Sequence, residues 1–170
     1  MGKISAVACT GLVAVAMLGA APAWSATTAH IESVAAKASS VAAGDDYPYR
    51  NGSWHEADPW NFYKRECTSF VAWRMRQLGV RFHNHYKGVR WSNANNWDNA
   101  ARRVGVRVDR RATVGAVAQW NRGRFGHVAY VSHVGRGTVT IEEYNRNGGH
   151  HYGRRTIRTS QVENFIHIAR

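Results

Sequence analysis

The feature that most constrains the fold is a change in the spacing of the apolar residues near Gly105. Before this glycine they recur with helical spacing, and after it apolar and polar residues alternate. Helices followed by a run of strands are typical of an α+β domain with an antiparallel sheet. We therefore expect N-terminal helices packed on an antiparallel sheet of about five strands.

Two helices are expected before the change. The first begins near Cys67 and ends at Gly79, because glycine is common directly after a helix. Arg74 falls on its polar side, with Arg76 and Gln77. Its apolar face consists of Phe70, Val71, Met75 and Leu78. The second and shorter helix covers Asn93 to Val104.

Five segments after Gly105 have the alternation of strands and are separated by turns that contain glycine or asparagine. These segments are residues 114–120, 127–135, 138–145, 152–158 and 165–170.

The N-terminus has the pattern of a secretory signal peptide. Lys3 precedes an uncharged apolar run, and Ala21-Pro22-Ala23 offers small residues for cleavage between residues 23 and 26. The alternative is a membrane anchor, which needs about 20 apolar residues and usually a flanking charge cluster. We expect a signal peptide over 1–23, a linker over 24–44, and one domain over 45–170 of a secreted protein.

Removal of the signal peptide leaves Cys67 as the single cysteine, so no intramolecular disulfide can form. An odd cysteine in a secreted protein suggests a reactive thiol or an intermolecular pair, and the alternative is a buried inert cysteine. Loss of Lys3 lowers the formal charge from +12 to +11. This surplus predicts an anionic partner, and wall polymers fit a secreted protein better than DNA.

A hairpin is expected where Gly135-Arg136-Gly137 joins two strands. If the turn is centred on Arg136, His127 lies opposite Asn145, and Glu143 lies diagonal to His127. Because side chains alternate along a strand, all three then share one face. This face match depends on the register, since a slip of one residue would break it.

A histidine beside a carboxylate and an amide is suited to act as a general base, because the acceptor fixes its tautomer. Cys67 is the obvious nucleophile. A helix start and an imidazolium both favour the thiolate and lower the thiol pKa from about 8.5. The backbone N–H groups of Cys67 and Thr68 could hold an oxyanion. The alternatives are a core histidine at 127 and solvated strand positions at 143 and 145.

Three motifs occur in order, RECTSFVAW, GHVAYV and IEEYN, with WSNANNW between the first two. Together they resemble the CHAP domain of bacterial peptidoglycan hydrolases, which are cysteine, histidine-dependent amidohydrolases and peptidases of papain-like fold. The resemblance covers about residue 45 to the end. It implies that Cys67 is the nucleophile, His127 the base, Glu143 the third catalytic residue and Asn145 a further polar residue nearby. Which of Glu143 and Asn145 orients the imidazole more directly stays open.

The chain departs from the family at two places. Many members carry Gly-Gln where this chain has Arg65-Glu66, and Glu66 cannot donate a hydrogen bond to an oxyanion unless it is protonated. Some members bind calcium in an acidic loop, of which only Asp58 is kept. Calcium prefers about six to eight oxygen ligands, so we expect no metal and no cofactor.

A substrate groove is predicted from the aromatic and amide residues between the first two motifs. Such side chains suit a sugar or a peptide, although packing is as good an explanation for the tryptophans. The candidates are Trp91, Asn93, Asn95 and Trp97.

These patterns predict a secreted, wall-associated peptidoglycan hydrolase that cuts an amide bond. The bond is either that between muramic acid and L-alanine or one within the stem peptide or cross-bridge. The alternatives are a non-catalytic wall-binding module and a basic secreted nuclease or toxin. The expected partners are peptidoglycan and anionic wall polymers. We expect no nucleic acid partner, no stable membrane insertion after signal cleavage, and a monomer.

Overall fold

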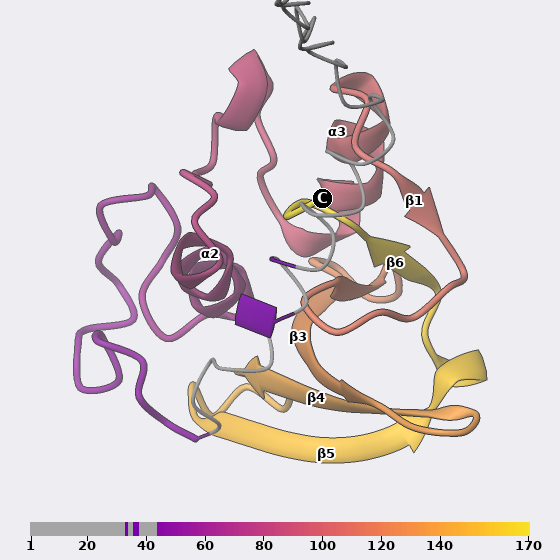
Figure 1. Ribbon diagram of the computed structural model, residues 1–170. Helices are drawn as coiled ribbons and strands as arrows, with labels where there is room; N and C mark the ends of the chain where they lie inside the picture. Colours follow the sequence, from indigo (N-terminus) through magenta and orange to yellow (C-terminus); the bar gives the residue numbers. More distant parts are fainter. Residues whose placement is uncertain (1–32, 34–35, 38–43) are drawn as a thin grey trace, which may run out of the picture.

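The computed structural model describes residues 33, 36–37 and 44–170 (Figure 1). The expected signal peptide and its cleavage site lie outside these residues, as does nearly all of the expected linker. Within the described part of the chain, no helix has both the length and the apolar character needed to cross a bilayer.

The two expected helices are present. Helix α2 covers Cys67–Gln77 and is followed by Gly79, whose φ of 89° is the left-handed conformation that glycine adopts easily. Helix α3 covers Trp97–Arg103 and is preceded by the short 3₁₀ helix η2, Ala94–Asn96. Two further 3₁₀ helices are η1, Tyr86–Gly88, and η3, Thr159–Gln161.

The strands form one antiparallel sheet with the order β1-β6-β2-β3-β4-β5. The strands are β1 Val108–Asp109, β2 Val117–Trp120, β3 His127–Val134, β4 Thr138–Tyr144, β5 Tyr152–Arg158 and β6 Asn164–Ile166. The expected α+β class is confirmed, with six strands instead of about five. The sixth is β1, whose two residues are too few to show an alternation.

The hairpin between β3 and β4 reaches the expected register by a different route. Gly135 N donates to Thr138 O, so the loop contains two residues instead of three. This shift is compensated by a bulge between Val131 and His133. Beyond the bulge Tyr130 lies opposite Glu142, as a turn centred on Arg136 predicts. The end of the hairpin that carries His127 and Glu143 therefore keeps the predicted face match.

The sheet separates two hydrophobic clusters, because neighbouring residues of a strand point to opposite faces. In β3, Val128 and Tyr130 join the cluster that contains α2 and α3, whereas Ala129 and Val131 join a smaller cluster around Phe165. Figure 1 shows α2 against β3 and β4, and α3 beside β1. The helix that begins with Cys67 is thus held against the strands that carry the other candidate residues.

Arg74 was expected on the polar side of the helix, and the structure corrects this expectation. Its side chain is fully buried, and its Nη2 lies 2.5 Å from Glu142 Oε2 on β4 and 3.0 Å from Asp46 Oδ1. Nη2 also donates to Gly44 O at 3.2 Å, and the guanidinium lies over the ring of Trp73. The side of α2 that was expected to face solvent is therefore covered by the segment that begins at Gly44.

The Arg74–Glu142 pair leads to a prediction about stability. The change Glu142→Gln leaves a buried guanidinium with only the half-exposed Asp46 as a charged partner. We expect a loss of about 3 kcal/mol in the free energy of unfolding, measured by urea denaturation. The control is Arg122→Gln, because the Arg122 side chain is 92% exposed and pairs with Glu163. Its effect should stay within about 0.5 kcal/mol. Equal effects of the two variants would contradict this account.

Candidate active site

Cys67 is the first residue of α2, and it is the free cysteine of the described residues. The N-cap Glu66 is extended, with φ of −95°, and its side chain makes no capping hydrogen bond. Phe70 N donates to Glu66 O in the first bond of the helix. The N–H groups of Cys67 and Thr68 therefore have no acceptor within the helix and can serve an external oxygen.

A buried hydrogen-bond network fixes the first turn of α2. Asp58 Oδ1 accepts from Trp60 N at 2.8 Å and from Phe62 N at 3.0 Å. Its second oxygen accepts from Ser69 Oγ, which also contacts the Tyr47 hydroxyl. Both oxygens of this carboxylate thus bind donors of the chain itself. Among the described residues, no group of three or more potential ligands is placed to hold a metal ion.

His127, the first residue of β3, lies between Cys67 and Glu143. Its Nε2 is 2.8 Å from Glu143 Oε2, so the carboxylate accepts the Nε2 proton and leaves Nδ1 for the thiol. Burial alone would lower the pKa of His127. Hydrogen bonding and charge interactions with Cys67 and Glu143 outweigh burial and raise this pKa to about 9. The ring is therefore cationic at neutral pH.

Arg155 on β5 also contacts Glu143. This contact was not predicted from the sequence. Its Nε donates to Glu143 Oε1 at 2.6 Å. Burial would raise the pKa of Glu143, but the hydrogen bonds from His127 and Arg155 prevail and lower it. Glu143 lies opposite Gly153 in the sheet, so Arg155 reaches it diagonally. The alternation of β5 could have suggested this contact only if the register between β4 and β5 had been known.

Asn145 does not hold the imidazole; it lies at the start of the β4–β5 loop. Its Nδ2 donates to Glu66 Oε2 at 2.7 Å, and its Oδ1 accepts from His150 N at 3.0 Å. His150 Nδ1 in turn lies 3.1 Å from Glu66 Oε1, and its ring stacks on Trp54. Of the two residues left open above, Glu143 is the one that contacts His127. Asn145 instead ties the loop to the N-cap of α2.

A groove of about 770 Å³ opens over Cys67 and His127. It lies between the start of α2 and the β4–β5 loop. Three aromatic side chains that are at least 42% exposed line it, namely Trp54, Tyr63 and Phe125. Such rings offer flat apolar surfaces to a ligand.

The predicted groove residues divide into two groups. Asn93 lines the groove, whereas Asn95 lies beside it and donates through Nδ2 to Arg124 O. Trp91 and Trp97 are a correction, because both are 0% exposed and belong to the core around Phe82. Packing, the alternative considered for the tryptophans, is what the structure shows.

Gly126 allows the groove wall to approach His127. Its φ is 69°, and a Cβ atom there would lie 2.5 Å from Asn95 N and 2.6 Å from Trp120 O. Both atoms belong to the backbone and cannot move aside cheaply. The glycine of the GHVAYV motif is thus required by close packing next to the histidine.

The raised pKa of His127 gives a testable prediction. Removing the negative charge of Glu143 by Glu143→Gln disfavours the imidazolium, so the pKa of His127 should fall from about 9 toward 6.5. The change is measured by NMR titration of the histidine rings. Glu163→Gln is the matched control, because Glu163 accepts from Asn121 N at 2.9 Å and does not contact His127. An unchanged His127 pKa in Glu143→Gln would refute the assigned cause.

Comparison with known proteins shows which family the chain resembles. The family model of the CHAP domain matches residues 57–145. The chain is 40% identical over 107 residues to the N-acetylmuramoyl-L-alanine amidase sle1 of Staphylococcus saprophyticus, with 61% of this chain and 31% of that protein covered. It is 39% identical over 102 residues to the probable autolysin LDP of Staphylococcus aureus, with 59% and 35% covered. The chain thus spans about a third of the length of these curated relatives.

A solved structure agrees with this match. The crystal structure of an N-acetylmuramoyl-L-alanine amidase from Staphylococcus aureus aligns with a TM-score of 0.56 at 27% identity. The alignment covers 75% of this chain and 38% of that one. The matched segment includes the start of α2, the first residue of β3 and the end of β4. The chain belongs to the CHAP domain family.

Proposed function

We propose that the protein is a peptidoglycan hydrolase in which Cys67 attacks an amide carbonyl and His127 transfers the protons. The observation that carries this proposal is the position of the His127 ring between the Glu143 carboxylate and the Cys67 thiol, in the wall of an open groove. The names of the relatives, an amidase and an autolysin, support the substrate class.

The reaction follows from this arrangement. The Cys67 thiolate adds to the carbonyl carbon, and the oxyanion accepts hydrogen bonds from the N–H groups of Cys67 and Thr68. Protonated His127 gives its Nδ1 proton to the leaving amine as the C–N bond breaks, and an acyl-enzyme remains. His127 then takes a proton from water, whose oxygen attacks the thioester and releases the acid and the thiol.

Glu143 and Arg155 act on the histidine as positioning residues. Glu143 accepts the Nε2 proton, which keeps Nδ1 directed at the thiol, and Arg155 holds the carboxylate through Oε1. The oxygens of Glu66 face the Asn145 amide and the His150 ring. We therefore assign the oxyanion to backbone donors and assign Glu66 to the attachment of the β4–β5 loop.

The bond that is cut is proposed to be the one between muramic acid and L-alanine, because the sle1 relatives and the structural neighbour are named for that reaction. Endopeptidase cleavage in the stem peptide or cross-bridge is the second candidate. We propose export by the signal peptide over 1–23, a linker over 24–44, and action at the cell wall as a monomer. The excess of basic residues supports attraction to anionic wall polymers.

The mechanism predicts that Cys67→Ala and His127→Ala each lower wall hydrolysis by at least about 10³-fold. His133→Ala is the matched control, because His133 is an exposed histidine of the same strand. Mass spectrometry of digested peptidoglycan measures the loss and identifies the new termini as lactyl acids or amino acids. Unchanged far-UV circular dichroism establishes that the variants fold. Full hydrolysis by folded Cys67→Ala would refute the proposal.

The role of Arg155 predicts a graded series. Arg155→Gln removes the charge that holds Glu143, so kcat should fall by about tenfold with little change in KM. Arg155→Lys should restore part of kcat, since a lysine keeps the charge. Arg154→Gln is the control on the neighbouring, exposed position and should match the wild type. A uniform loss in all three variants would indicate a general effect on the strand.

A further inference from the structure

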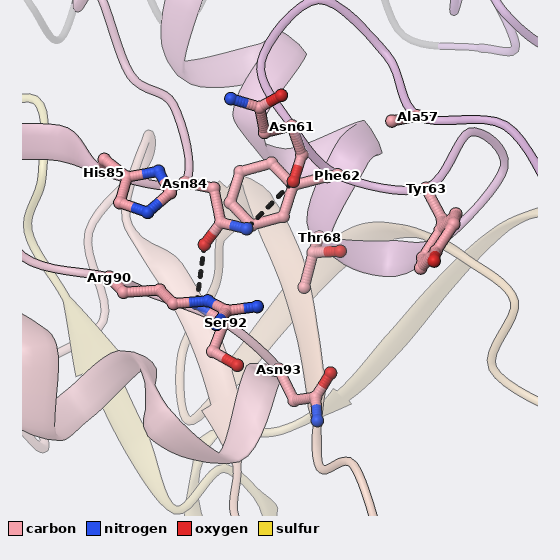
Figure 2. A pocket seen from close by; sticks show the side chains of 10 residues that line it. All are labelled: Ala57, Asn61, Phe62, Tyr63, Thr68, Asn84, His85, Arg90, Ser92 and Asn93. Carbon is pink, nitrogen blue, oxygen red and sulfur yellow. Dashed lines mark hydrogen bonds between the residues drawn. The ribbon is translucent and has the colours of Figure 1, made fainter.

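A second hollow of about 330 Å³ lies beside the groove that contains Cys67 (Figure 2). Tyr63, Thr68 and Asn93 line both hollows, so the second hollow is a side pocket of the groove. In Figure 2 the segment that carries Arg90, Ser92 and Asn93 runs along one side, and Thr68 and Tyr63 lie on the other. A substrate held at Cys67 can therefore extend into this side pocket.

The wall of the side pocket is built by hydrogen bonds. Asn84 Nδ2 donates to Asn61 O at 2.9 Å, and Asn84 Oδ1 accepts from Ser92 N at 2.7 Å (Figure 2). Ser92 has a φ of 56°, and its carbonyl accepts from the indole of the buried Trp97. The loops that meet at Asn84 are thus fixed to each other and to the core, so the pocket is formed before any ligand arrives.

Arg90 is the charged group of the side pocket. Its exposed side chain reaches toward the middle of the pocket in Figure 2. Within residues 44–170 no carboxylate lies within ion-pair distance of the Arg90 guanidinium, although Arg74, Arg102 and Arg155 all have acidic partners. An unpaired guanidinium in a preformed wall is suited to bind a carboxylate with two parallel hydrogen bonds.

The other side chains of the pocket suit a peptide. Amide and hydroxyl groups of Asn61, Ser92 and Asn93 can donate to peptide carbonyls and accept from peptide N–H groups. Thr68 directly follows Cys67 and reaches the side pocket, so the pocket begins next to the reacting carbonyl. An extended peptide advances about 3.5 Å per residue, so residues close to the cleaved amide can enter the side pocket that Arg90 lines.

We propose that this side pocket binds a free carboxylate of the stem peptide, and that Arg90 selects for it. The proposal rests on the proposed function and adds a substrate preference to it: a peptide whose acidic residue near the cleaved bond is free binds better than one in which that carboxylate is amidated. Arg90 is a specificity-determining residue that contacts substrate away from the reacting atoms.

The first experiment measures binding without cleavage. Cys67→Ala protein is titrated calorimetrically with a soluble muramoyl peptide that carries a free carboxylate on its acidic residue, and with the same peptide amidated there. The free acid should bind about tenfold more tightly. Adding Arg90→Gln should remove this difference, and Arg90→Lys should keep part of it. Arg103→Gln, at an exposed arginine in the last turn of α3, is the matched control and should keep all of it.

The second experiment measures cleavage by protein with Cys67 intact. Arg90→Gln should raise KM for the free acid by about tenfold. The kcat for the free acid and the KM for the amidated peptide should stay unchanged. Equal binding of the two peptides by Cys67→Ala protein, or a preference that survives Arg90→Gln, would overturn the side-pocket proposal. Selective binding without cleavage of either peptide or of whole peptidoglycan would instead overturn the proposed function and leave the side pocket established.

Discussion

The buried ion pair between Arg74 and Glu142 determines how the two halves of the candidate site meet. Arg74 lies about two helical turns after Cys67 on α2, and Glu142 directly precedes Glu143 on β4. One contact of 2.5 Å therefore fixes α2, which begins at Cys67, relative to β4, which carries the Glu143 that contacts His127. Burying two charges is costly unless further bonds satisfy them, and here Asp46, Gln77 and Gly44 O supply further partners to the two terminal nitrogens of the guanidinium.

The same balance between burial and pairing sets the chemistry of the site. Arg155, Glu143 and His127 form a row in which each charged group neighbours one of opposite sign, and the row ends at the Cys67 thiol. Burial opposes ionisation of both Glu143 and His127, and pairing prevails at each. A row of this kind keeps the imidazole cationic and aligned before a ligand binds, which in the proposed mechanism leaves little reorganisation for the attack.

Local patterns predicted what depends on local structure. The start of α2 at Cys67 and the shared face of His127 and Glu143 follow from helical spacing and strand alternation. The face match held although the loop is shorter than expected, because a bulge restores the register. Such patterns do not predict which distant segment of the chain packs over a helix or pairs with a strand. The burial of Arg74 depends on the segment at Gly44, and the contact of Arg155 depends on the pairing of β4 with β5.

The tryptophans of WSNANNW support the side pocket from the hydrophobic core instead of lining it. Trp91 and Trp97 are candidates for the groove in the sequence, with packing as the alternative, and both lie in the core. Yet Trp97 Nε1 donates to the carbonyl of Ser92, which lines the side pocket, and Trp91 Nε1 donates to Tyr86 O. Their large rings fix the backbone whose polar side chains line the pocket. The aromatic surface offered to a ligand comes instead from Trp54, Tyr63 and Phe125, which lie outside this motif.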